Sequence, residues 1–320
     1  MSLVGDVKAG FAKRPRSLPP NYFYDALGLR LFEAIGRLPW YRITEAETRL
    51  LRRVAPAVAG ALAGPVRVIE LGSGSGEKLA AVVEALRSRR KKADVHVVDL
   101  SATAVAASVG RLAGIPGVSV CGHRTTYVKG LREAASGPRG RGECLVLFLG
   151  SNIGNFDPGD ATRLLTAVRR RLRPGDALLL GTDLVKPERE LLDAYDDPLG
   201  LTAVFNLNLL LRLNRELEAD FDLRAWAHRA VWNAGARRVE MHLVSLKDQC
   251  VRIPGARVVA DFAAGEIFWT ESSHKYEPED VDRIAADAGF RRERRWVDGD
   301  AKFALNLCRA VPEGRVEKDS

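Results

Sequence analysis

The sequence contains few cysteines, and none is placed like a disulfide partner or a metal ligand. The four cysteines stand far apart, at Cys121, Cys144, Cys250 and Cys308 of 320 residues. The five histidines show no ligand spacing with cysteines or with clustered acids. We therefore expect reduced thiols, histidines with surface or structural roles, and no metal site.

Long apolar segments and internal repeats are also missing. No stretch approaches the roughly 18–20 uncharged apolar residues of a membrane helix. Residues 1–20 mix basic side chains with little apolar sequence, which is unlike a signal peptide. The sequence therefore predicts a cytoplasmic protein that makes no contact with a membrane.

No aromatic-interleaved basic stripe accompanies the formal net charge of +8. The excess comes largely from arginines in segments expected to be helical, such as 169–171 and 291–292. This pattern is typical of a solvated surface, and we expect no nucleic-acid partner. With 46% hydrophobic and 28% charged residues, the chain can bury a full core.

One segment combines a strand, a glycine loop and a helix. Residues 66–71 form an apolar run that breaks into Gly72-Ser73-Gly74-Ser75-Gly76, and a helical pattern begins at Glu77. A second apolar run, 94–99, ends in Asp99. Glycines allow a tight turn and a close approach to a ligand, and an acid at the next strand tip can bind ribose hydroxyls. The combination predicts a site for an adenosine-containing cofactor.

Strands and helices alternate from residue 66 to residue 180. We expect strands at 66–71, 94–99, 118–121, 144–149 and 177–180, and helices at 46–62 (with Thr44 as a possible N-cap), 77–90, 102–113 and 157–172. Helices at 187–195, 200–218 and 277–288, antiparallel strands at 238–244 and 257–262, and a closing hairpin at 294–297 and 303–308 complete the pattern. This order predicts an α/β, doubly wound, seven-stranded Rossmann-like sheet with an inserted α+β domain. We expect the cofactor domain at 46–184 plus 276–320, and a substrate-binding domain at 1–45 plus 185–275.

The loop favours a methyl donor over a nicotinamide. A dinucleotide fingerprint reads Gly-x-Gly-x-x-Gly, whereas here the third glycine comes one residue early. Glu70 and Glu77 flank the loop; negative charges there repel a pyrophosphate but tolerate a sulfonium and an ammonium. We therefore predict S-adenosyl-L-methionine as the cofactor.

Two polar side chains outside the loop have two interpretations each. Asn155 follows the strand at 144–149, where open α/β sheets bind ligands, but it also stands where a helix cap is expected before Asp157. Glu271 follows an aromatic run and is either an acceptor inside a pocket or an exposed carboxylate.

Nearly the whole chain resembles the L-histidine Nα-methyltransferases of ergothioneine biosynthesis. The most specific matching segments lie at 23–25, 70–74, 148–155, 181–186, 194–197, 214–217, 240–241 and 270–275. The resemblance implies three successive transfers of methyl from S-adenosylmethionine to the histidine α-amine, giving Nα,Nα,Nα-trimethylhistidine (hercynine). At 122–126 the chain differs from the family, where an Asp-Phe pair usually reads the adenine.

The resemblance also implies roles for individual side chains. The cofactor would be bound by Gly72, Ser73, Gly74, Lys78 and Asp99. The substrate would be bound by Tyr41, Asn155, Tyr195, Met241, Glu271 and Ser273, with Asn155 and Tyr195 at its carboxylate, and Glu271 and Ser273 at its imidazole. The groups close to the reaction would be Tyr24, through water to the amine, and Asn155.

Three alternatives stay open. One is an N-methyltransferase for another amino acid or a histidine derivative, and an acid at Glu271 favours imidazole over these. Another is an RNA methyltransferase, but residues 151–155 lack its Asn/Asp-Pro-Pro-Tyr-type run. The third is a non-enzymatic nucleoside-binding regulator. We expect a small-molecule enzyme that acts as a monomer.

Overall fold

The computed structural model describes residues 2–137 and 142–312. The chain forms two compact units: unit 1 comprises Met1–Arg42 and Lys186–His274, and unit 2 comprises Ile43–Val185 and Lys275–Ser320. The chain thus leaves unit 1 before Ile43, returns to it at Lys186 and leaves it again after His274.

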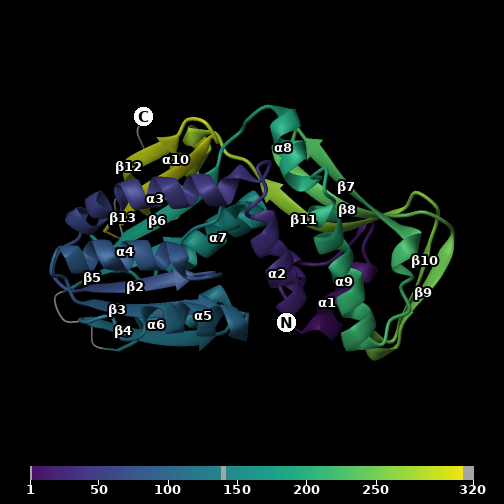
Figure 1. The fold of residues 1–320 in the computed structure, drawn as a ribbon, viewed down its shortest axis with the longest axis horizontal. Helices are drawn as coiled ribbons and strands as arrows, with labels where there is room; N and C mark the ends of the chain where they lie inside the picture. Colours follow the sequence, from purple (N-terminus) through teal and green to yellow (C-terminus); the bar gives the residue numbers. More distant parts are fainter. Residues whose placement is uncertain (1, 138–141, 313–320) are drawn as a thin grey trace. The chain divides into compact units, whose positions relative to one another are not determined.

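Unit 2 is built on a seven-stranded sheet in the order β12-β13-β6-β5-β2-β3-β4 (Figure 1). The strands are β2 (Val66–Leu71), β3 (Ala93–Asp99), β4 (Val118–Arg124), β5 (Glu143–Phe148), β6 (Ala177–Asp183), β12 (Phe290–Asp298) and β13 (Phe303–Ala310). From β6 to β4 all neighbours are parallel, while β13 runs antiparallel to both β6 and β12. The predicted seven-stranded α/β sheet is therefore confirmed.

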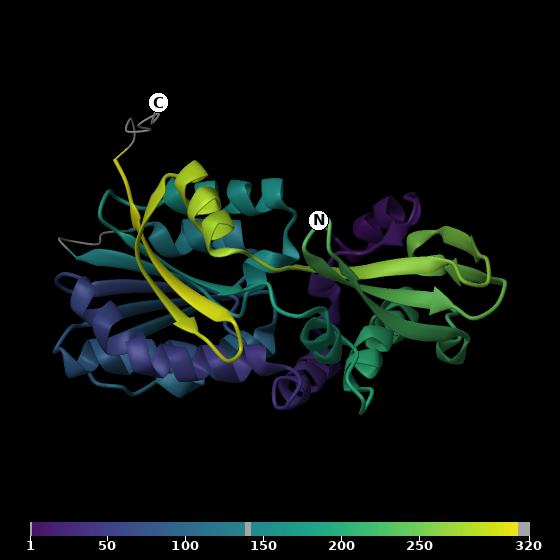
Figure 2. The same ribbon diagram turned by 90° about the horizontal axis from the view of Figure 1, so that it is seen from above.

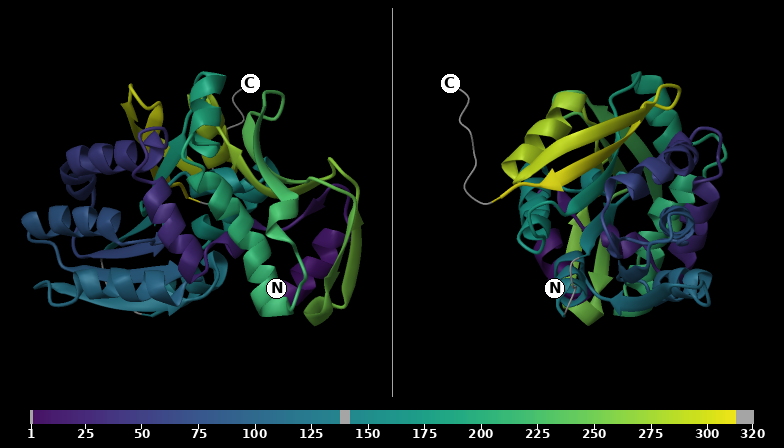
Figure 3. Two further views of the ribbon diagram at one scale, coloured as in Figure 1. Left: turned by 45° about the vertical axis from the view of Figure 1, so that its right-hand side comes forward. Right: turned by 90° about the vertical axis from the view of Figure 1, so that its left-hand side faces the viewer.

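Helices cover both faces of this sheet (Figure 2). They are α3 (Arg42–Ala61), α4 (Glu77–Ser88), α5 (Ala102–Leu112), α6 (Tyr127–Ala135), α7 (Pro158–Arg169) and α10 (Pro278–Asp287). Every residue of β2 and β6 is buried, as expected for central strands between two helix layers. The hairpin β12–β13 lies beside α10 (Figure 3).

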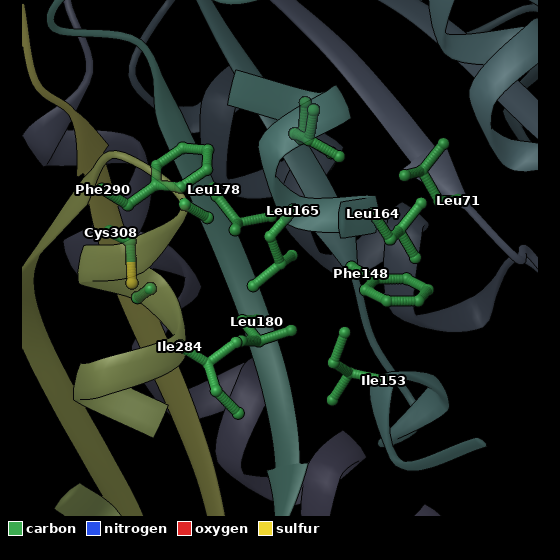
Figure 4. Close-up of a cluster of buried hydrophobic side chains, with 14 of the residues drawn as sticks. Leu71, Phe148, Ile153, Leu164, Leu165, Leu178, Leu180, Ile284, Phe290 and Cys308 are labelled. Carbon is green, nitrogen blue, oxygen red and sulfur yellow. The ribbon is translucent and has the colours of Figure 1, made fainter. Parts of the chain in front are cut away.

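A large apolar cluster fills the space between the sheet and the layer of α6, α7 and α10 (Figure 4). Phe148, Leu165, Leu180, Ile284 and Phe290 are among its buried members. Each such side chain contributes about 1.5–3 kcal/mol when fully buried, so this layer holds the parallel strands in register. The strand ends that carry the polar loops are therefore rigidly supported.

The helix α3 begins at Arg42, two residues before Thr44, the residue that the sequence predicts as its N-cap. Thr44 lies inside its first turn, where its carbonyl oxygen accepts a hydrogen bond from Thr48 Oγ1 at 2.8 Å. The prediction of Thr44 as the N-cap is therefore wrong, because the helix includes Arg42 and Ile43 as well.

Unit 1 contains a four-stranded sheet in the order β1-β11-β8-β7 and a two-stranded ribbon β10-β9. The strands are β1 (Arg16–Ser17), β7 (Trp226–Asn233), β8 (Arg238–Ser245), β9 (Gln249–Ile253), β10 (Val258–Phe262) and β11 (Ile267–His274). The helices are α1 (Leu3–Phe11), α2 (Ala26–Ile35), α8 (Glu188–Tyr195) and α9 (Leu201–Leu217). Both α8 and α9 pack against β7 and β8, and α9 also packs against α2.

Four short 3₁₀ turns complete the regular structure among the described residues: η1 (Pro20–Phe23), η2 (Asn152–Asn155), η3 (Leu223–Ala225) and η4 (Pro254–Ala256). Of these, η2 follows β5 at the carboxyl edge of the parallel strands. The glycine loop after β2 and the end of β3 lie at the same edge, because parallel strands end on one side of a sheet.

Candidate functional site

The glycine loop after β2 requires glycine where its backbone is packed closely. Gly72 has φ +81°, and a Cβ there would lie 2.9 Å from Asn152 Nδ2 and 3.0 Å from the Tyr127 hydroxyl. Gly76 precedes α4 with φ +72°, and a Cβ would lie 2.7 Å from Ser108 Oγ. Gly74, at φ +51°, has open space around its Cβ position. The backbone is thus closely packed at both ends of the loop. It is open at Gly74, where a ligand can approach it.

The Asp99 carboxylate is held by two backbone groups at the tip of β3. Its Oδ2 accepts a hydrogen bond from Ser73 N at 3.0 Å, and its Oδ1 accepts one from Ser101 N at 2.8 Å. A carboxylate oxygen has two lone pairs, so each oxygen keeps capacity for a further donor. This arrangement fixes an acceptor beside the loop, as recognition of ribose hydroxyls requires.

Three buried polar atoms beside the loop have no hydrogen-bond partner among the described residues: Glu70 Oε2, Ser73 Oγ and Ser108 Oγ. Glu70 is 1% exposed, and burial raises the pKa of its carboxyl to about 8. The nearby Lys78 lowers that pKa, whereas Glu47 and Asp99 raise it. The sequence argument that counted Glu70 as a negative charge is therefore wrong for the protein alone, because burial favours the neutral acid near pH 7.

Lys78 is paired with a buried carboxylate. Its Nζ lies 2.6 Å from Glu47 Oε2, and the Glu47 side chain is fully buried. The backbone N–H of Gly150 also donates a hydrogen bond to both Glu47 oxygens, each at 2.8 Å. The lysine, the helix α3 and the loop after β5 are thus joined by one carboxylate. A Cβ on Gly150 would lie 3.5 Å from the Lys78 Nζ, which places the ammonium against this loop.

Asn155 is not a helix cap. The N-cap of α7 is Asp157, and Asn155 closes the 3₁₀ turn η2. Its side chain is half-buried and makes no hydrogen bond within the described parts of the chain. The cap interpretation is therefore wrong, and the amide at the carboxyl edge of the sheet keeps its hydrogen-bonding capacity.

In unit 1, the pairing of β8 and β11 gathers three predicted substrate residues. A bulge between Trp269 and Glu271 shifts the register, so that Glu271 lies opposite Met241. Residues directly opposite each other share a face, and so do residues two apart on a strand. Met241, Glu271 and Ser273 therefore lie on one face, and they are only 2%, 9% and 4% exposed. The interpretation of Glu271 as an exposed carboxylate is wrong.

Aromatic side chains extend this group. The Tyr195 hydroxyl, at the end of α8, donates a hydrogen bond to Ser273 Oγ at 2.7 Å. The Tyr41 ring packs edge-on against Tyr195 with centroids 6.1 Å apart, and Tyr41 and Tyr24 both pack against Phe32. Unit 1 thus brings together all of the predicted substrate-side residues that it contains: Tyr24, Tyr41, Tyr195, Met241, Glu271 and Ser273.

Comparison with known proteins shows the family to which the chain belongs. The sequence profile of a family described as "Histidine-specific methyltransferase, SAM-dependent" matches residues 3–310. The chain belongs to this family.

Individual relatives point the same way. A histidine N-alpha-methyltransferase of Mycobacterium tuberculosis is 44% identical over 96% of this chain and 95% of its own length. The ergothioneine biosynthesis protein 1 of Neurospora crassa is 30% identical over 92% of this chain and 33% of that longer protein. An L-tryptophan methyltransferase of Psilocybe serbica is 28% identical over 94% of this chain and 91% of its length.

Two residues that hold Tyr195 in place, His228 and Asn206, were not among the predicted site residues. His228 Nε2 lies 2.8 Å from the carbonyl oxygen of Tyr195, and its Nδ1 lies 2.9 Å from Asn206 Nδ2. Since the amide nitrogen is a donor, Nδ1 accepts and the Nε2–H donates to the carbonyl. Burial lowers the pKa of His228, which keeps this neutral tautomer. A histidine in a strand gives no sequence signal for such a role.

Glu47 was also missed, although the sequence contains a signal for it. It lies on the same helical face as the buried Leu50, Leu51 and Val54, and is the one acid of that apolar stripe. An acid among core positions indicates a buried partner, which here is Lys78 with the amide of Gly150.

Two histidines and one cysteine that are separated in the sequence lie close together, and the expectation of no metal site stays a prediction. His96, Cys121 and His123 each offer a ligand atom, and these atoms lie within 4.8 Å of one another. The spacing along the chain concealed the group because it depends on the pairing of β3 with β4.

A membrane span requires a long and apolar helix. Among the helices in residues 2–137 and 142–312, none meets both conditions.

Proposed function

We propose that this methyltransferase transfers methyl groups from S-adenosylmethionine to the α-amine of L-histidine, three times in succession, giving hercynine in ergothioneine biosynthesis. The observation that carries this proposal is the buried Glu271 on one face with Ser273 and Met241, next to Tyr195. Membership of the family and the mycobacterial and fungal relatives support the same substrate.

The residues at the carboxyl edge of unit 2 fit an adenosyl sulfonium donor. Gly72, Ser73 and Gly74 would bind it along the open loop, and Asp99 would accept its ribose hydroxyls. The buried carboxyl of Glu70 has a pKa raised to about 8, and a sulfonium and ammonium bound nearby would favour its ionised form. When bound, the donor supplies a methyl group activated by the adjacent sulfonium. The ammonium of Lys78 is already paired with Glu47. Any contact between Lys78 and the donor would therefore coexist with this ion pair.

The imidazole of histidine suits the Glu271–Ser273 pair. Glu271 accepts the ring N–H, and Ser273 serves the other ring nitrogen. A hydrogen bond to a buried carboxylate contributes about 1.5–3 kcal/mol, or roughly ten- to a hundredfold in affinity over a ring without a donor. The Tyr195 hydroxyl donates a hydrogen bond to Ser273 Oγ, which fixes the position of this hydroxyl on the same face as Glu271. Tyr195 would thus hold Ser273 in place as well as serve the substrate carboxylate.

The reaction needs alignment and a neutral nitrogen rather than a strong base. In each transfer the amine lone pair forms the N–C bond, the S–C bond breaks, and S-adenosylhomocysteine leaves. The ammonium loses one proton before each of the three transfers. Tyr24 is half-buried among Phe32 and Phe205, and is suited to pass this proton through water without clamping the growing nitrogen.

The deciding experiment is mass spectrometry of an amino-acid panel incubated with the enzyme and donor. We expect L-histidine to gain one, two and then three methyl units. Glu271→Ala should weaken histidine binding by about ten- to a hundredfold, with donor affinity unchanged. Glu188→Gln, an exposed acid on α8, is the matched control and should change neither. No methylation of histidine, or equal loss of both affinities in Glu271→Ala, contradicts the proposal.

A second candidate substrate is tryptophan, favoured by the fungal tryptophan methyltransferase among the relatives. The indole has one N–H and no ring acceptor, so it would use Glu271 and make no ring hydrogen bond with Ser273. The same panel separates the two, because a tryptophan enzyme would tolerate Ser273→Ala whereas a histidine enzyme would lose affinity.

We assign the cofactor role to residues 46–184 with 276–320 and the substrate role to the remainder. Monomeric state and cytoplasmic location stay predictions.

A further inference from the structure

A polar cluster lies on β3 and β4, the last two strands in the order of the unit 2 sheet. The register pairs His96 of β3 with Cys121 of β4, and His123 stands two residues further along β4. All three side chains therefore share one face of the sheet. Glu133 of α6 reaches His123, which identifies this as the face that α6 covers. The cluster has no part in the function proposed above.

The two histidines are linked to each other and to one carboxylate each. His96 Nδ1 lies 3.0 Å from His123 Nε2. The remaining nitrogens point outward: His96 Nε2 lies 3.3 Å from Asp94 Oδ2, and His123 Nδ1 lies 3.3 Å from Glu133 Oε2. Metal-binding histidines usually donate their second ring N–H to a carboxylate in this way, which fixes the tautomer and directs the other lone pair inward.

If both imidazole rings are neutral, they carry one proton fewer than the three contacts require. Both carboxylates are acceptors, so each outward contact needs a ring N–H from His96 or His123. Two neutral imidazoles carry two N–H groups, and the outward contacts use both. The inner nitrogens then face each other at 3.0 Å with two lone pairs and no proton. Either a third proton on the pair or a metal ion between the two nitrogens removes this conflict.

We propose that His96, His123 and Cys121 form a binding site for a single borderline-soft divalent transition-metal ion of the zinc class. Imidazole nitrogen and thiolate sulfur are the ligands that such ions prefer, and three protein ligands with water complete a tetrahedron.

The geometry needs little adjustment. Two nitrogens about 2.0–2.1 Å from one tetrahedral zinc ion lie about 3.3–3.4 Å apart, which is slightly more than the 3.0 Å between the inner nitrogens. The sulfur of Cys121 lies within 4.8 Å of both, and this cysteine is exposed, so a small movement of its side chain would bring the sulfur to an ion held by the two nitrogens. Asp94 also accepts hydrogen bonds from Arg67 at 2.8 Å and Ser119 at 3.0 Å, which hold it in its outer position.

The test uses the full chain after removal of metals by a chelator, titrated with Zn²⁺ by calorimetry and with Co²⁺ by absorption spectroscopy. We expect one ion per chain and a sulfur-to-cobalt charge-transfer band. Cys121→Ser should abolish that band and weaken Zn²⁺ binding at least about tenfold, and His123→Gln should weaken it similarly. Cys250→Ser removes the other exposed cysteine, in unit 1, and should leave both signals intact.

Three results would overturn the site: no Zn²⁺ or Co²⁺ binding by the wild-type chain, unchanged binding in both Cys121→Ser and His123→Gln, or loss of the band in Cys250→Ser. Circular dichroism of each variant checks that it is folded, and thermal melting gives an independent measure. Zn²⁺ should raise the melting temperature of the wild type and of Cys250→Ser, but not that of His123→Gln.

Discussion

Replacement of Glu70 by glutamine tests how the glycine loop recognises positive charge. The change keeps the size of the side chain and replaces an acid by a neutral amide. Glu70 is buried at the end of β2, and burial raises its pKa to about 8. A bound sulfonium and ammonium favour the ionised carboxylate. We therefore expect S-adenosylmethionine to expel a proton from the wild-type protein when it binds, and to expel none from this position in Glu70→Gln.

The size of the effect follows from the pKa. At pH 7 a group of pKa about 8 is roughly nine-tenths protonated, so full ionisation on binding releases about 0.9 proton. The same linkage raises the apparent donor affinity about tenfold between pH 7 and pH 9. Glu70→Gln should bind the donor more weakly at pH 9 and show little of this pH dependence.

Calorimetry in two buffers of different ionisation heat measures the proton release directly. The ammonium of the donor titrates near pH 7.7–8.0 as well, so the informative quantity is the difference between wild type and Glu70→Gln. Equal proton release by the two proteins would refute the reasoning, since it would mean that Glu70 stays protonated beside the bound donor.

The same substitution has a counterpart in stability. The pKa of Glu70 is higher in the folded chain, about 8, than its ordinary value of 4.5. The stability that its proton provides is therefore full below about pH 4.5 and is lost as pH rises through 8. Between pH 6 and pH 8, wild type should lose about 2 kcal/mol relative to Glu70→Gln in urea unfolding without donor. If the difference in unfolding free energy between the two proteins stayed constant from pH 6 to pH 8, Glu70 would be in a more polar environment than its burial indicates.

Three further substitutions have distinct expected outcomes. Asp99→Ala removes the acceptor that Ser73 N and Ser101 N hold in place, and should weaken donor binding about tenfold or more; unaltered affinity in calorimetry would separate Asp99 from the ribose. Tyr195→Phe removes the hydrogen bond to Ser273, and should raise the KM for histidine without changing donor affinity, whereas a shift in both would indicate a folding defect. Asp25→Ala removes the N-cap of α2 and should cost about 1–3 kcal/mol in chemical denaturation while leaving kcat of the folded enzyme unchanged; a large fall in kcat would give Asp25 a part in the chemistry.

The strands and helices of unit 2 were largely predictable because their signals are local. The continuous apolar run of β5 and the largely apolar β2 are each followed by a glycine-containing loop, and the glycine loop after β2 is visible directly in the sequence. The helix α6 was missed because nine residues give too short a periodic pattern. The strand β11 was missed because its sequence, IFWTESSH, mixes polar and apolar residues without clean alternation, and a bulge at Glu271 interrupts the register.

The candidate site was predictable where one segment carries it and not where pairing creates it. The loop residues Gly72 and Gly74 lie within three positions of each other, so their shared role is visible in the sequence. The link of Lys78 to Glu47 and the meeting of His96 with Cys121 depend on which helix or strand becomes a neighbour. Such neighbours are set by packing of the whole sheet, which spacing along the chain does not encode.

Several residues in the segments that carry the family resemblance act on the fold rather than on the substrate. Asp25 accepts hydrogen bonds from Gly28 N, Asn208 and Arg215, and so joins α2 to α9. Asp197 accepts three backbone N–H groups at the start of α9.

Lys275 and Asp183 form an ion pair at 3.0 Å with both side chains almost fully buried, where loss of either partner would leave an unpaired charge. In this chain these positions support the fold, and none of them is among the residues proposed to contact the substrate ring. In the function proposed above, Glu271 and Ser273 discriminate between rings, and their face is built by the pairing of β8 with β11. A chain that kept Asp25 and Lys275 but lost Glu271 would therefore fold in the same way and select a different amine.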